Sequence, residues 1–189
     1  MIKLYKLIAI FLMKYGNHIL IKPTMICMLS CDYCIVNKTL GKRPKFKEVS
    51  PKAWITLLSK RLPNVVTISG GEPMMYPGIE DIINYLTDRK VFVTISTNLL
   101  KLNLDINASK YLWLYATNHK TNNRLFEKNM YIYQIYGYNV SVSEFGDVAV
   151  IKGARLRKIK QKQTDKKIEC YAPDLRKFNS WVEMEENGI

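Results

Sequence analysis

The sequence has few cysteines and no long apolar run, and each shortage excludes a class of protein. Four cysteines in 189 residues do not make a disulfide scaffold, because a chain of this length buries a core without the staples that matter mostly below about 80 residues. The apolar run Leu7–Met13 is far shorter than the about 20 residues that cross a bilayer, and no small-residue cleavage site follows it. We therefore predict a cytoplasmic protein with no membrane partner, whose N-terminal segment packs on the core as a helix or strand.

Acidic residues are also scarce. The chain holds 16 Asp and Glu against 29 Lys and Arg, which gives a net charge of +13. The excess is concentrated between Lys152 and Lys167, where eight basic residues are opposed only by Asp165. Such a run could attract nucleic acid, but aromatic residues do not interleave with its charges as they do on a base-stacking platform. A solvated surface segment is the favoured interpretation, and nucleic-acid binding is the alternative.

β-Branched and apolar runs alternate along the chain with segments of helical period. Helices are expected at residues 50–62, 78–89 and 123–136. Ser50 can cap the first of them, and Pro51 suits its first turn. Strands are expected at residues 17–23, 64–69, 91–96, 110–117, 139–145 and 147–153. Strands that alternate with helices indicate βαβ units, a parallel sheet and right-handed crossovers.

The length of the chain limits how far such a sheet can close. A complete eight-unit barrel needs about 250 residues, more than the 189 present. We predict an α/β fold: a partial (β/α) barrel of about five to six parallel strands with outer helices. This domain is expected to cover residues 1–153, and residues 154–189 are expected to form a short, basic C-terminal extension.

Three of the four cysteines lie close together, at Cys27, Cys31 and Cys34, with the spacing C-x3-C-x2-C. A structural zinc site needs four ligands, usually as two separated pairs. His18 or His119 could supply the missing ligand. An iron–sulfur cluster that is held by only three cysteines has one iron without a protein ligand, and an open position of this kind is what catalysis needs.

The stretch "CMLSCDYC", Cys27 to Cys34, resembles the CxxxCxxC signature of the radical S-adenosylmethionine (radical SAM) family. The resemblance implies that Cys27, Cys31 and Cys34 hold a [4Fe-4S] cluster, and that the amino and carboxyl groups of S-adenosylmethionine (SAM) chelate the open iron. The aromatic Tyr33 fits the signature as well, and the resemblance places it near the adenine.

A second motif, "SGGEP", directly follows a predicted buried strand. By itself, Gly70-Gly71 indicates a βα turn or a place where the backbone approaches a ligand closely. The Glu72 carboxylate could accept hydrogen bonds from an ammonium group. The resemblance to radical SAM proteins assigns Gly70, Gly71, Glu72 and Pro73 to the amino group of SAM. The interval from Cys34 to Gly70 leaves room for one helix and one strand, as the family pattern requires.

Polar residues lie at the ends of the next two predicted strands, and the resemblance assigns some of them to SAM: Ser96, Thr97, Asn98 and Thr117. Ligands of parallel α/β sheets bind at the carboxyl ends of strands, so these positions are physically reasonable. The family often has a TNG-like sequence after its third strand, and here Leu99 replaces the glycine. His119 could contact substrate, although a single His is more often structural.

The resemblance implies a radical SAM enzyme. Its reduced cluster cleaves SAM, and a 5′-deoxyadenosyl radical abstracts hydrogen from a substrate: a peptide, a nucleotide or RNA, or an enzyme that it activates. A flavodoxin- or ferredoxin-like partner would supply the electron. Two alternatives are a degenerate module that binds the cluster or SAM without turnover, and a zinc-binding interaction protein. Cys170 is isolated, so we expect a structural or free thiol there and no second cluster.

Overall fold

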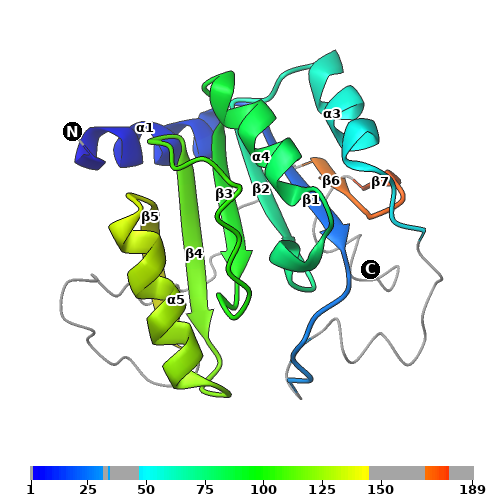
Figure 1. The fold of residues 1–189 in the computed structure, drawn as a ribbon. Helices are drawn as coiled ribbons and strands as arrows, with labels where there is room; N and C mark the ends of the chain where they lie inside the picture. Colours follow the sequence, from blue (N-terminus) through cyan, green and yellow to red (C-terminus); the bar gives the residue numbers. More distant parts are fainter. Residues whose placement is uncertain (1, 32–33, 35–46, 145–168, 179–189) are drawn as a thin grey trace.

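A seven-stranded sheet organises the computed structural model, which describes residues 2–31, 34, 47–144 and 169–178 (Figure 1). The strand order is β5-β4-β3-β2-β1-β6-β7. The strands are β1 (His18–Thr24), β2 (Val65–Gly70), β3 (Phe92–Thr97), β4 (Leu112–Asn118), β5 (Asn139–Glu144), β6 (Glu169–Tyr171) and β7 (Lys177–Phe178). The first six are parallel and β7 is antiparallel to β6. The sheet is not closed, so the predicted α/β partial barrel is confirmed.

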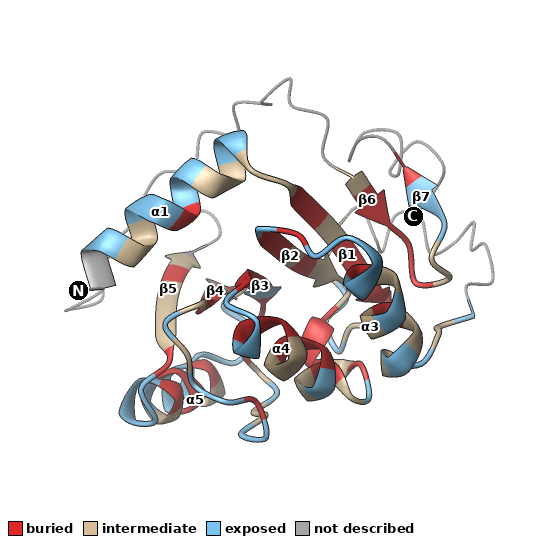
Figure 2. Ribbon diagram, turned by 90° about the horizontal axis from the view of Figure 1, so that it is seen from above, coloured by how far each residue is buried: buried red, intermediate tan, exposed pale blue. Residues whose placement is uncertain are grey.

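Three helices cover one face of the sheet, and a fourth lies on the other side (Figure 2). The first three are α3 (Pro51–Lys60), α4 (Ile79–Asp88) and α5 (Asn123–Ile135), and the fourth is α1 (Ile2–Tyr15). A short 3-10 helix, η1 (Pro73–Met75), follows β2. The predicted cap is present, since Oγ of Ser50 accepts a hydrogen bond from the backbone N–H of Ala53. No helix in the described part of the chain is long and apolar enough to span a membrane.

The core lies between the sheet and helices α3 to α5. Helix α4 buries Ile79, Ile82, Ile83 and Leu86, and this i, i+3, i+4, i+7 spacing forms one apolar stripe. The stripe packs in the same cluster as alternate residues of the strands, such as Val66 and Ile68 of β2, Val93 and Ile95 of β3, and Leu112 and Leu114 of β4. Because side chains alternate between the two faces of a strand, the intervening residues face away from these helices.

The face of the sheet turned away from α3 and α4 is partly polar near the strand beginnings. Oγ1 of Thr67 on β2 lies 2.8 Å from Nε2 of His18 and 2.9 Å from Oγ1 of Thr94. These contacts cross β1, β2 and β3 in one row. His18 therefore has a structural partner at the start of β1, far from the cysteines that follow the end of that strand.

The final part of the described chain is integrated in the sheet. Strand β6 pairs with β1 in parallel, with Ile19 opposite Glu169 and Ile21 opposite Tyr171, and β7 pairs with β6. Residues 169–178 of the predicted C-terminal extension are thus continuous with the main sheet. The strand predicted at residues 147–153 and the basic run Lys152–Lys167 lie outside the described residues.

Candidate functional site

The segment after β1, which carries the cysteines, is hydrogen-bonded directly to the Gly70–Pro73 segment after β2. The backbone N–H of Gly71 donates to the carbonyl of Thr24 over 3.0 Å, and that of Glu72 donates to the carbonyl of Ile26 over 2.7 Å. A Cβ atom on Gly71 would lie 2.3 Å from the carbonyl oxygen of Ile26. The close approach of the two segments therefore requires a glycine at position 71.

Gly70 meets the same constraint and a second one. A Cβ atom there would lie 2.2 Å from the carbonyl oxygen of Thr24. Its φ of 124° is also a conformation that residues with a side chain rarely adopt. The two glycines let the cysteine-bearing segment lie against the end of β2, which joins the two sequence motifs at one edge of the sheet.

Glu72 connects this edge to the end of β3. Its side chain is almost fully buried, with 1% exposed. Oε1 accepts hydrogen bonds from Oγ1 of Thr97 (2.7 Å) and the N–H of Met74 (3.1 Å), and Oε2 accepts one from the N–H of Asn98 (2.7 Å). Burial raises the pKa of Glu72, while these hydrogen bonds act in the opposite direction. Glu72 is thus a structural brace, a role that sequence reasoning missed.

The thiols of the cysteine segment have nitrogen donors nearby. Sγ of Cys27 accepts a hydrogen bond from the backbone N–H of Leu29 (3.4 Å) and one from Nδ2 of Asn98 (3.8 Å). Sγ of Cys31 lies 3.9 Å from Nδ1 of His119. Burial raises the pKa of Cys27, and the neighbouring charges of Glu72, Cys34 and Cys31 raise it further. The backbone N–H of Cys34 donates to the carbonyl of Cys31 (3.0 Å), so these two cysteines lie within one turn of the chain.

The cysteine segment offers thiol side chains, which as thiolates are the ligands of iron–sulfur clusters. Among the described residues, no group of three or more His, Cys, Asp or Glu side chains is placed as the ligands of one metal ion. His18 cannot be the fourth zinc ligand, because the seven residues of β1 separate it from the cysteines by about 20 Å. Partly buried, reduced thiols of this kind are suitable cluster ligands.

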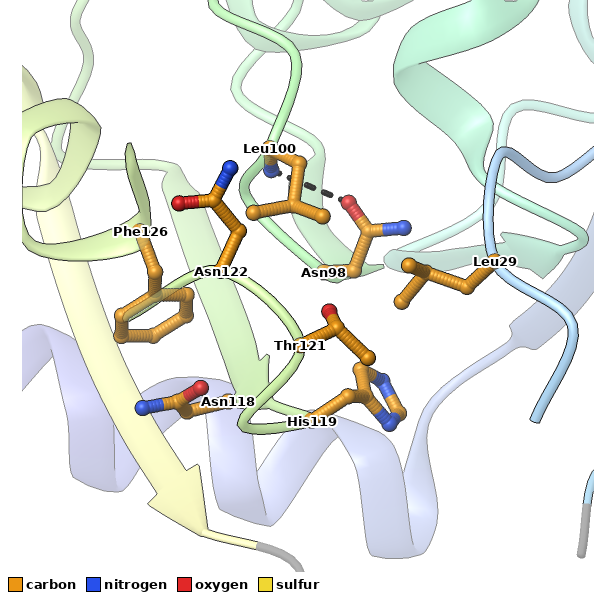
Figure 3. A pocket seen from close by; sticks show the side chains of 8 residues that line it. All are labelled: Leu29, Asn98, Leu100, Asn118, His119, Thr121, Asn122 and Phe126. Atoms are coloured by element: carbon orange, nitrogen blue, oxygen red, sulfur yellow. Dashed lines mark hydrogen bonds between the residues drawn. The ribbon is translucent and has the colours of Figure 1, made fainter. Parts of the chain in front are cut away.

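A small pocket lies beside the cysteines, between the carboxyl ends of β3 and β4 and the start of α5 (Figure 3). It is lined by Leu29, Asn98, Leu100, Asn118, His119, Thr121, Asn122 and Phe126. Asn98 and His119, both noted from the sequence, thus line the same space. No sequence pattern indicated Thr121 and Phe126, because their place in the pocket depends on how α5 packs.

The other residues assigned to SAM occupy different positions at this edge. Thr97 is buried against Glu72, and Pro73 begins η1 and is buried. Ser96 has an exposed side chain. Oγ1 of Thr117 lies 3.2 Å from Oγ of Ser143 on β5, and among the described residues no hydrogen bond joins Thr117 to the Glu72 network. Tyr33 lies outside the described residues.

Comparison with known families finds a match that covers the cysteine motif and the Gly70–Pro73 segment. The model of the Radical SAM superfamily matches residues 21–115, about half of the 189-residue chain. Over 73 residues the chain is 32% identical to a 7-carboxy-7-deazaguanine synthase from Clostridium acetobutylicum, and the matched part is 38% of this chain and 33% of that protein.

Solved structures support the fold. SuiB from Streptococcus suis, in a crystal structure with S-adenosylmethionine, matches with a TM-score of 0.55 and 21% identity over 70% of this chain and 36% of that chain. The structure of SuiB with its precursor peptide SuiA gives a TM-score of 0.54 and 22% identity, over 70% and 35% of the two chains. The chain therefore spans about a third of the length of the relatives that it matches.

Proposed function

The chain belongs to the radical SAM superfamily, and from this premise we propose that it cleaves S-adenosylmethionine reductively to start radical chemistry on a substrate. The family recognised in the sequence and its cofactors, a [4Fe-4S] cluster and SAM, are confirmed by the family match. The assignment of individual residues to these cofactors, and the turnover itself, are part of the proposal.

The observation that carries the proposal is the direct hydrogen bonding between the two motifs. Since the N–H groups of Gly71 and Glu72 bond to the segment that leads into Cys27, a cluster held by Cys27, Cys31 and Cys34 would lie beside the Gly70–Pro73 segment. A cofactor that touches both motifs has to bind here. The bound cofactors would supply a 5′-deoxyadenosyl radical that abstracts hydrogen from the substrate.

The residues around the cysteines then have separate tasks. The N–H groups of Gly71 and Glu72 are bonded to the cysteine segment, and we assign the carbonyl groups of Gly70 and Gly71 to the ammonium group of SAM, because a carbonyl accepts hydrogen bonds. Glu72 positions these carbonyls by its bonds to β3. We assign Tyr33, Pro73, Ser96, Thr97, Asn98 and Thr117 to the surroundings of SAM, in line with the family resemblance.

The substrate belongs to one of three classes: a peptide, a nucleotide or RNA, or an enzyme that is activated. SuiB was crystallised with a precursor peptide, which supports the first class. The Clostridium relative is a 7-carboxy-7-deazaguanine synthase, which supports a small heterocyclic compound related to the second. A flavodoxin- or ferredoxin-like protein would supply the single electron that each cleavage consumes.

The decisive experiment is anaerobic reconstitution followed by SAM cleavage. We expect about four iron atoms per chain and release of 5′-deoxyadenosine on addition of dithionite and SAM. Cys31→Ala should lose both iron and product, while the matched variant Cys170→Ala should retain both, because Cys170 is buried in β6 away from the other cysteines. A loaded protein that releases no 5′-deoxyadenosine would instead be a binding module without turnover. Stoichiometric zinc without iron would identify the zinc-binding alternative.

A further inference from the structure

Helix α1 exposes an apolar stripe along its whole length. Five side chains on one side of the helix form the stripe, with exposed fractions from 37% to 64%: Leu4, Leu7, Ile8, Phe11 and Tyr15. Their i, i+3, i+4, i+7, i+11 spacing places them on one helical face, and Ile10, 42% exposed, lies at its side. An apolar patch of this kind on a surface helix marks an interaction site.

The opposite side of α1 accounts for its attachment to the protein. Ala9 is buried in a cluster with Val65 and Phe92, the residues that begin the apolar parts of β2 and β3. Tyr5 and Leu12 pack against the same cluster. The helix therefore has two apolar sides, and the sheet covers only one of them. The sequence analysis predicted that this segment packs on the core, and the side that carries Ala9 does so. The prediction did not cover the exposed side.

The exposed stripe is bordered by positive charge. Lys14 lies on the helix beside Tyr15, with Nζ 4.9 Å from the ring centre. Two further lysines lie where the helix meets the sheet: Nζ of Lys6 is 5.5 Å from the ring of Trp113, and Nζ of Lys110 is 4.9 Å from the ring of Tyr5. The first 31 residues of the sequence contain no Asp or Glu. Leucine, isoleucine and phenylalanine flanked by lysines alone match the requirements of an anionic lipid surface.

A second copy of the chain fits this stripe less well. A 14-residue helix is about 21 Å long and about 10 Å wide, so contact between two such helices falls well short of the about 800 Å² per partner of a standard stable interface. The dimer would also bring lysines together, and α1 has no acidic residue to pair with them. A lipid surface has neither disadvantage, because its area is unlimited and its charge is negative.

The position of α1 leaves the cysteine edge free. The helix packs on Val65 and Phe92, where strands β2 and β3 begin, and the cysteine segment follows the end of β1 (Figure 1). Because the strands are parallel, their beginnings and ends lie at opposite edges of the sheet. We propose that α1 docks the protein peripherally on an anionic lipid surface, with the candidate active site facing away from the lipid. This proposal departs from the sequence prediction of no membrane partner and is independent of the proposed catalytic function.

The test is co-sedimentation of the full chain with vesicles of phosphatidylcholine, with and without phosphatidylserine. We expect binding to the vesicles that contain phosphatidylserine, at least tenfold weaker binding to phosphatidylcholine alone, and loss of binding as salt is raised. Leu7→Asn with Phe11→Asn should weaken binding at least tenfold. Tyr131→Asn with Ile135→Asn is the matched control, because these side chains are equally exposed on α5 (63% and 62%), and it should bind normally.

A third variant separates charge from apolar contact. Lys14→Glu should weaken binding to the anionic vesicles and reduce its salt dependence, and circular dichroism should show that each variant keeps its helix content. Three results would overturn the proposal: no binding to either vesicle, equal binding to both, or a concentration-dependent dimer in light scattering that the Leu7 and Phe11 variant abolishes. The last result would assign the stripe to a second copy of the chain.

Discussion

Oγ1 of Thr97 donates a 2.7 Å hydrogen bond to Oε1 of Glu72, although the two residues are 25 positions apart in the sequence. The bond joins the end of β3 to the segment that follows β2. Because the N–H of Glu72 also donates to the carbonyl of Ile26, one residue connects three neighbouring segments at the cysteine edge. Glu72 therefore joins the cysteine segment, through its backbone, to the end of β3, through its carboxylate.

Glu72→Gln should destabilise the folded chain by about 1–3 kcal/mol. Both oxygens of the Glu72 carboxylate accept hydrogen bonds, and glutamine replaces one of them with an NH2 group, which would point at a buried donor and leave it without an acceptor. The three donors are Thr97, Met74 and Asn98, and all three bonds are buried. Urea denaturation of the purified chain measures the loss. Glu127→Gln is the control, since Glu127 is exposed on α5, and it should change the stability by less than about 0.5 kcal/mol. If the two variants are equally stable, the hydrogen bonds of Glu72 do not stabilise the fold.

Leu99 provides a second prediction, because its backbone conformation favours glycine whereas its buried position favours a large apolar side chain. Its φ of 58° is left-handed, which costs a residue with a Cβ about 1–2 kcal/mol, and this explains why the family often has glycine there. Its side chain is fully buried, and removal of a buried leucine side chain costs about 2–5 kcal/mol. Both Leu99→Ala and Leu99→Gly should therefore be less stable than the natural chain.

The order of the two Leu99 variants is the sharper test. Leu99→Gly should be more stable than Leu99→Ala by about 1 kcal/mol, because glycine relieves the left-handed strain that alanine keeps. Leu58 is the matched control: it is buried in helix α3, where glycine is about 1 kcal/mol worse than alanine. Chemical denaturation of the four variants should give opposite orders at the two positions. The same order at both would mean that Leu99 is not held in a left-handed conformation.

Gly71→Ala tests the contact between the two motifs. The new methyl group would lie 2.3 Å from the carbonyl oxygen of Ile26, so the cysteine segment has to move away from β2. We expect reduced iron content after anaerobic reconstitution. Gly137→Ala is a useful comparison, because a Cβ at that position meets nothing within 4 Å and only the positive φ of 81° opposes it. That variant should lose about 1 kcal/mol of stability and take up iron normally; a similar loss of iron in both would point to general destabilisation.

The elements with strong local periodicity were predictable from the sequence. The expected helices at 78–89 and 123–136 are found as α4 (Ile79–Asp88) and α5 (Asn123–Ile135), since an apolar stripe of period 3.6 can hardly be mistaken for a strand. The cap at Ser50 was predictable for the same reason, because it depends only on residues that are close in the sequence.

Long-range pairing was not predictable. Strand β6 has three residues, Glu169–Tyr171, too few to show a period, and its pairing with β1 joins segments about 150 residues apart. The motifs likewise indicated which residues gather at the edge but not their partners. The assignment of Glu72 to SAM stays a prediction, and it did not indicate that the oxygens of Glu72 accept bonds from Thr97, Met74 and Asn98. Such bonds depend on strand register, which no local pattern specifies.

The last prediction concerns His119, whose Nδ1 lies 3.9 Å from Sγ of Cys31. Burial lowers the pKa of His119, so the imidazole is neutral near pH 7 and carries one N–H, which can donate to the sulfur if it is on Nδ1. Hydrogen bonds to cluster sulfurs stabilise the more negative, reduced state and raise the reduction potential. If Cys31 is a cluster ligand, His119→Ala should therefore lower the potential without loss of iron.

A redox titration followed by electron paramagnetic resonance measures that shift directly and does not depend on turnover. Thr121→Ala is the matched control, because Thr121 lines the same pocket, its side chain is exposed, and no bond from it to a thiol is found among the described residues. It should leave the potential unchanged. Asn98→Ala should lower the potential as His119→Ala does, since Nδ2 of Asn98 donates to Sγ of Cys27. If neither variant moves the potential, the two nitrogen donors do not reach the thiolates once the cluster is bound, and their proximity to the cysteines serves only to pack this edge of the sheet.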